Sequence, residues 1–169
     1  MLSRKVLCWS VVLGLAFATP TFAATMDDVR LAIKEQRMFD AFQDLSELAE
    51  TGDPVAQYEL AGFYHYGRVG PVNFDKARQW YERSAKQGNP DAMLGLAVIY
   101  GFGQGVPQDK QAAFRWLVIA GTQHLDPVGA EKVASTRDSL AAGLRPDQIE
   151  AALAEARAFT PRPEQAAAQ

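Results

Sequence analysis

Apolar residues recur at helical spacing over most of residues 26–159. In the segment that follows Pro54, small and large apolar side chains share one helical face, formed by Ala56, Leu60, Ala61 and Tyr64. Residues 93–99 are apolar nearly all round, which predicts a central, largely buried helix. Because no stretch alternates with the two-residue period of a half-buried strand, the pattern predicts an all-α protein.

The same pattern occurs twice, since residues 52–87 match residues 88–123 at an offset of 36. A fixed period of this size is typical of stacked repeats, in which each helical hairpin buries its apolar face against its neighbours. We therefore expect a right-handed α/α solenoid of stacked helical hairpins. The eleven identical pairs are Gly52/Gly88, Pro54/Pro90, Ala56/Ala92, Leu60/Leu96, Ala61/Ala97, Tyr64/Tyr100, Gly67/Gly103, Pro71/Pro107, Ala77/Ala113, Trp80/Trp116 and Gln87/Gln123.

Capping residues divide each copy into two helices. Asp53 and Asn89 precede a proline and an apolar-periodic run, as expected of a helix cap followed by proline at the first helical position. Asn73 and Asp109 can cap the second helix of each copy, and Gly67 can end the first. Ala41 and Ala49 fall in register with the repeat, so a degenerate hairpin is expected before it.

These signals predict the organisation of the whole chain. Met26–Glu35 and Phe39–Glu50 are expected to be helices, as are Pro127–Ala142 and Pro146–Phe159. The predicted divisions are a signal peptide (1–23), an N-terminal capping hairpin (24–51), two repeats (52–87 and 88–123), C-terminal capping helices (124–159) and a disordered tail (160–169).

Residues 1–23 have the pattern of a secretory signal peptide. Arg4 and Lys5 precede an apolar run of 13 residues, too short to span a bilayer, and small residues before position 24 suit cleavage after Ala23. We therefore expect an exported protein, periplasmic or secreted. Cleavage would remove Cys8, the lone cysteine, and change the formal net charge from −3 to −5. This acidic balance argues against nucleic acid or an anionic membrane as a partner.

The two copies together resemble the Sel1-like repeat, a relative of the tetratricopeptide repeat. The resemblance rests on Gly52–Ala61 with Tyr64, Gly67, Lys76-Ala77 and Trp80-Tyr81, and on their counterparts through Trp116. Val69 stands where the turn usually carries its second glycine, and Ala112 replaces the lysine. The resemblance implies an adaptor or scaffold for protein assembly, often in bacterial envelopes, without naming a partner.

Catalytic and metal-binding patterns are weak in this sequence. His65 and His124 lie in different units, and no thiol accompanies them, so we expect no metal. No serine lies in a glycine-flanked elbow, and the glycine-rich stretch 101–105 follows a helix and leads to Asp109 rather than to a phosphate-binding lysine. We expect no cofactor and no catalytic group.

The remaining functional candidate is the surface of the first helices, which should line the concave side of the stack. The residues there that the repeat pattern does not use are Gln57, Tyr58, His65, Asp91 and Met93. We interpret the chain as a non-catalytic scaffold that binds a protein or peptide at these residues. Two alternatives stay open: a regulatory or inhibitory partner of an envelope enzyme or toxin, and an enzyme acting on cell-wall or β-lactam substrates.

Overall fold

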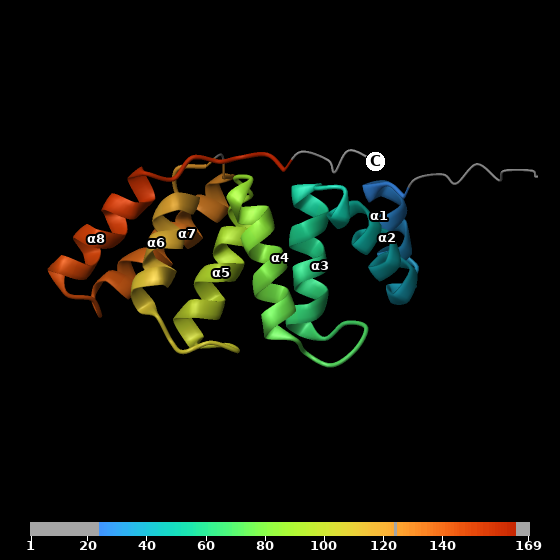
Figure 1. The fold of residues 1–169 in the computed structure, drawn as a ribbon, viewed down its shortest axis with the longest axis horizontal. Coiled ribbons are helices and arrows are strands. Elements are labelled where there is room, and N and C mark those ends of the chain that lie inside the picture. Colours follow the sequence, from blue (N-terminus) through green and yellow to red (C-terminus); the bar gives the residue numbers. More distant parts are fainter. Residues whose placement is uncertain (1–23, 124, 165–169) are drawn as a thin grey trace, which may run out of the picture.

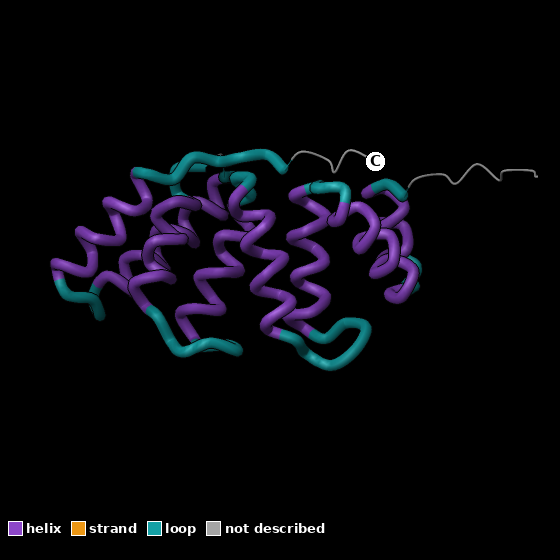
Figure 2. The backbone as a smooth tube through the Cα atoms, viewed as in Figure 1, coloured by secondary structure: helices purple, strands orange, loops and turns teal. Residues whose placement is uncertain are grey.

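The computed structural model describes residues 24–123 and 125–164, so the expected signal peptide and His124 lie outside the described residues. This part of the chain forms eight helices and no strand, stacked in chain order along one elongated axis (Figures 1 and 2). The predicted all-α solenoid is confirmed. The helices are α1 (Met26–Lys34), α2 (Met38–Glu50), α3 (Pro54–Tyr66), α4 (Phe74–Lys86), α5 (Pro90–Phe102), α6 (Lys110–Ala120), α7 (Pro127–Ala141) and α8 (Pro146–Arg157).

The predicted caps begin the helices of the two repeats. The Asp53 carboxylate accepts from the amides of Val55 and Ala56, and the Asn89 side chain accepts from the amide of Ala92. Asn73 and Asp109 cap α4 and α6 in the same way. At the other end, Gly67 and Gly103 stop α3 and α5 in the left-handed conformation, with φ of 62° and 68°, which costs little only for glycine.

Two apolar clusters hold the stack together. One joins α1, α2 and α3 around Leu45, Leu60 and Phe63, and the other joins α3 to α7 around Leu96 and Leu117. Trp80 is half-buried and packs against both clusters. The core is therefore continuous through the repeats, as stacked hairpins require.

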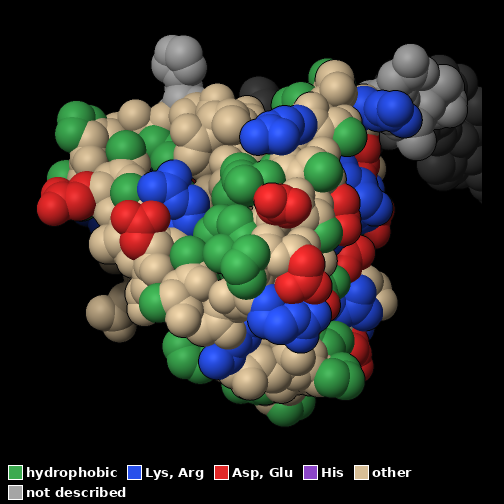
Figure 3. Space-filling view, turned by 90° about the vertical axis from the view of Figure 1, so that its left-hand side faces the viewer, with side chains coloured by type: hydrophobic (Ala, Val, Ile, Leu, Met, Phe, Trp, Pro, Cys, Tyr) green, Lys and Arg blue, Asp and Glu red, His purple; other side chains and the backbone are tan. Residues whose placement is uncertain are grey.

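The last two helices depart from the hairpin plan. Both α7 and α8 pack mainly against α6, whereas each earlier pair packs within itself and against the next pair. The end of the stack near α8 exposes apolar side chains among mixed charges (Figure 3). Helices α7 and α8 thus close the array by packing against α6.

Residues 160–164 were expected to belong to a disordered tail, and the structure corrects this. They run in extended form along one edge of the stack, back from α8 toward α3 (Figure 1). The amide of Arg162 donates to the carbonyl of Lys86 at 2.8 Å, and Glu164 lies against Gly52. Sequence patterns missed this because the segment has no helical period and finds its partners far away in the chain.

Candidate functional site

A groove of about 500 Å³ opens along the helices α3, α5 and α7, with contributions from α4 and α6. Because α3 and α5 are the first helices of the two repeats, the groove lies where the repeat pattern predicted a concave surface. Its walls are rich in aromatic and aliphatic side chains, and its volume is in the usual range for ligand sites. The main apolar residues are Tyr58, Tyr66, Tyr81, Leu94, Val98, Phe102, Leu117 and Leu140.

Tyr81 forms the floor of this groove because Gly95 leaves room for it. A Cβ atom on Gly95 would lie 2.8 Å from the Tyr81 ring, so the buried ring rests directly on the backbone of α5. Tyr58 packs beside Tyr81, with 6.0 Å between ring centroids. Burial raises the pKa of both phenols, and the Asp91 carboxylate adds to the effect at Tyr58. Both rings therefore stay neutral at physiological pH.

His65 lies within a cage of aromatic rings. It stacks on Tyr66 at 4.7 Å and meets the edges of Phe74 and Tyr81 at 5.5 and 5.8 Å. Burial lowers the pKa of His65, although the neighbouring Gln104 amide opposes that effect. The neutral imidazole is thus part of the apolar wall, and its Nδ1 atom has no hydrogen-bond partner in the described chain.

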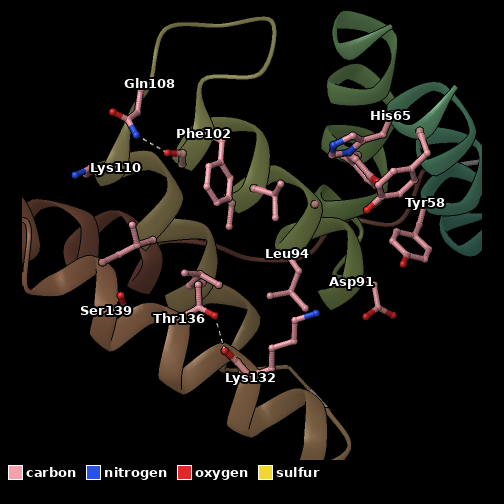
Figure 4. A pocket seen from close by; sticks show the side chains of 18 residues that line it. Tyr58, His65, Asp91, Leu94, Phe102, Gln108, Lys110, Lys132, Thr136 and Ser139 are labelled. Atoms are coloured by element: carbon pink, nitrogen blue, oxygen red, sulfur yellow. Dashed lines mark hydrogen bonds between the residues drawn. The ribbon is translucent and has the colours of Figure 1, made fainter. Parts of the chain in front are cut away.

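Three charged side chains lie at the groove. Lys110 begins α6, Lys132 extends from α7, and Asp91 lies in the first turn of α5 (Figure 4). Within residues 24–123 and 125–164, none of the three forms an ion pair. The α6–α7 side therefore offers two positive charges in a chain whose net charge is negative.

The structure brings together three of the five predicted site residues and separates the other two. Tyr58, His65 and Asp91 all line the groove. The expectation that Gln57 and Met93 share this surface is wrong, because both side chains are fully buried and neither lines the groove. Met93 packs in the central cluster, where α5 is surrounded by other helices. Gln57 donates to the carbonyl of Ala49 and accepts from Gln87, so its polar side chain is satisfied inside the stack.

Several groove residues were not predicted from the sequence. Tyr66 and Phe102 occupy equivalent positions just before the glycine that ends each first helix, and they are 66% and 76% exposed. This recurring exposed aromatic could have been recognised in the repeat pattern. Lys132 and Leu140 could not have been recognised in this way, because α7 lies beyond the two repeats and cannot be aligned with them.

The described residues contain no group of three or more His, Cys, Asp or Glu side chains that could hold a metal ion. None of the helices among them is long and apolar enough to cross a membrane. The groove hydroxyl of Thr136 donates to the carbonyl of Lys132, and Gln108 donates to the carbonyl of Gly101. Because these two polar groups bond to the backbone, the aromatic rings, Lys110, Lys132 and Asp91 set the chemical character of the groove.

Comparison with known proteins identifies the class of this fold. Residues 54–89 and 90–124 each match the Sel1 repeat. The backbone superimposes on the crystal structure of c5321, "a protective antigen present in uropathogenic Escherichia coli strains displaying an SLR fold", with a TM-score of 0.71. That match covers 79% of this chain and 28% of the antigen at 21% sequence identity, and it shows the fold alone. Residues 54–124 of this chain are therefore two Sel1 repeats.

Two further relatives share the repeat region. A 90-residue stretch is 37% identical to "Uncharacterized protein NMB1327" of Neisseria meningitidis serogroup B (strain ATCC BAA-335 / MC58), covering 51% of this chain and 19% of that protein. A 93-residue stretch is 29% identical to "Protein SHC1" of Saccharomyces cerevisiae (strain ATCC 204508 / S288c), covering 55% and 18%. The aligned stretches thus span about a fifth of these relatives.

Proposed function

We propose that this protein is an exported, non-catalytic adaptor that binds a short peptide segment of a partner protein in the groove along α3, α5 and α7. Sel1 repeats generally mediate protein interactions, and the groove is the feature that supports such a role here. The observation that carries the proposal is the combination of exposed aromatic rings with Lys110 and Lys132, which form no ion pair within the described residues.

The chemistry of the groove favours a particular kind of peptide. Tyr66, Val98 and Phe102 expose apolar surface at its rim, and such surface is stabilised when an apolar side chain covers it. Lys110 and Lys132 would attract carboxylates on the same segment. We therefore expect the ligand to carry an aromatic or aliphatic anchor next to an acidic residue.

A non-catalytic role agrees with the state of the polar groups in the groove. Nucleophilic catalysis needs a nucleophile hydrogen-bonded to a base. The Thr136 hydroxyl donates to a backbone carbonyl, and aromatic rings enclose the imidazole of His65. Binding thus accounts for the groove without a chemical step.

Selection of phage-displayed random peptides on the purified protein tests this proposal. We expect enriched peptides with an apolar anchor and adjacent acidic residues, bound at least ten times more weakly by the double variant Lys110→Glu/Lys132→Glu. Arg30→Glu/Lys34→Glu on α1 is the matched control, because it makes the same charge change at the other end of the stack. Equal losses in both double variants would contradict the assignment of the groove.

Export rests on residues 1–23 and needs its own measurement. N-terminal sequencing of the protein recovered from its native cells should give Ala24 as the first residue. A mature chain that retains residues 1–23 would contradict this part of the proposal.

A further inference from the structure

The edge of the stack formed by the turns between helix pairs holds residues 160–164 in a specific manner. Pro161 and Pro163 lack an amide hydrogen, so Arg162 and Glu164 supply the two backbone N–H donors of residues 161–164. Both donors are used: Arg162 donates to the carbonyl of Lys86 at 2.8 Å, and Glu164 donates to Oε1 of Gln87 at 2.9 Å. The segment is therefore bound as an extended peptide, through its backbone.

The Glu164 side chain fits a polar slot. One carboxylate oxygen accepts from Nε2 of Gln57 and from Nη2 of Arg83, both at 2.9 Å, and the other accepts from Nε of Arg83 at 3.2 Å. The Arg83 guanidinium, and then the Gln57 amide, hold the pKa of Glu164 below its ordinary value of 4.5, against the opposing effect of burial. The slot thus recognises the ionised carboxylate.

The slot is held in place by residues other than the tail. Gln57 keeps its hydrogen bonds to Ala49 and Gln87. Arg83 lies over the Trp80 ring at 4.3 Å and also contacts Glu50 at 3.2 Å. Gln57 and Arg83 therefore keep these contacts when the carboxylate leaves. Because the slot is preformed, little conformational entropy is lost when a carboxylate binds again.

Two glycines leave the track for the peptide open. A Cβ atom on Gly52 would lie 3.3 Å from Cβ of Glu164, and one on Gly88 would lie 3.2 Å from Cβ of Pro161. The peptide backbone can approach these turns closely because neither residue carries a side chain.

The repeat fold itself does not require this slot. At an offset of 36 residues, Met93 replaces Gln57 and Ile119 replaces Arg83, and both replacements are buried in the apolar core. The second repeat thus forms the same hairpin without a carboxylate-binding pair. The hairpin therefore does not need the slot in order to form.

We propose that Gln57, Arg83, Lys86 and Gln87 form a second peptide-binding site, here called the turn-edge site, which takes an extended acidic segment of a partner protein and is occupied in this structure by the chain's own residues 160–164. A tethered segment acts at an effective concentration in the millimolar range, so the tail keeps the site closed to weak ligands. This inference goes beyond the groove proposed above and does not depend on it.

The proposal can be tested with a variant of the full chain in which the tail no longer occupies the turn-edge site, here called the vacated chain. Arg162→Pro removes the amide that donates to Lys86, and Glu164→Ala removes the carboxylate, so the double variant should release the tail. The probe is a fluorescent synthetic peptide with the sequence of residues 158–169. We expect the double variant to bind it at least ten times more tightly than the unaltered chain. The same peptide with glutamine in place of its Glu164 should bind at least ten times more weakly.

Changes in the slot provide the matched control. In the vacated chain, Gln87→Ala should weaken peptide binding, whereas Gln123→Ala, its equivalent in the second repeat, should not, because Gln123 bonds to Ile119 and Thr122. Hydrogen exchange reports whether position 164 has lost its protection in the vacated chain. Retained protection, or a released tail without tighter peptide binding, would overturn the proposal.

Discussion

The two repeats share a backbone frame but differ in what they expose and bury. Several positions that are identical between them serve the fold: Gly67 and Gly103 end the first helices, while Leu60 and Leu96 fill the core. Positions that differ between the two repeats line the proposed binding groove. Tyr58, His65 and Tyr81 of the first repeat correspond to Leu94, Gly101 and Leu117 of the second, and all six line the groove. The proposed binding groove is thus lined in part by positions at which the two copies have diverged.

The largest expected effect tests the shared frame. Leu60→Ala and Leu96→Ala should each lower the free energy of unfolding by about 2–5 kcal/mol, because both side chains are fully buried and truncation leaves a cavity. Urea unfolding measures both, with Val128→Ala at an exposed position expected to stay within about 0.5 kcal/mol. A large loss in one repeat and none in the other would break the equivalence of the two copies.

A second prediction concerns a glycine found in the second repeat only. Gly95→Ala should destabilise the protein by about 1–3 kcal/mol, because the new methyl group collides with the Tyr81 ring and overpacks the core. Gly62→Ala on α3 is the control, since open space surrounds that position and alanine favours a helix over glycine by up to about 1 kcal/mol. Thermal unfolding should therefore shift in opposite directions. Equal shifts would show that Tyr81 does not rest on α5.

The smallest effect concerns the slot of the first repeat. The pKa of Glu164 is lower in the folded protein than its ordinary value of 4.5, so its ionised form contributes stability above pH 4.5, and this contribution is lost as pH falls through the folded pKa. Glu164→Gln should cost about 0.2–1 kcal/mol at pH 7, the range of solvent-accessible ion pairs. Denaturant unfolding should show the two proteins converging in acid. A difference that stays constant down to pH 2 would contradict the ion pairing.

Local sequence signals were sufficient to predict the helices. Asp53, Asn73, Asn89 and Asp109 each cap a helix as expected, because a cap acts through hydrogen bonds within a few residues of the chain. The 36-residue offset then gave the order of stacking. Fold class and most helix ends follow from interactions of this short range.

The site was predicted only in part because it depends on long-range packing. Gln57 appeared free of the repeat pattern, yet Ala49, Gln87 and Glu164 satisfy it inside the stack. Met93 lies on α5, which is apolar nearly all round. The sequence of α5 therefore does not show which of its faces packs against other helices. The lysine of α7 reaches the groove through the packing of α7 on α6, which no repeat register encodes.

Site-specific photo-crosslinking tests the central claim most directly, namely that the groove binds a partner segment. A benzophenone amino acid replaces Phe102 in the groove or, as the matched control, Phe39 on α2, which is also exposed and lies outside the groove. Irradiation of cells that express each variant should give a discrete adduct from position 102, lost when Lys110→Glu/Lys132→Glu is added, and no such adduct from position 39. Identical adducts from both positions, or none from position 102, would contradict the account.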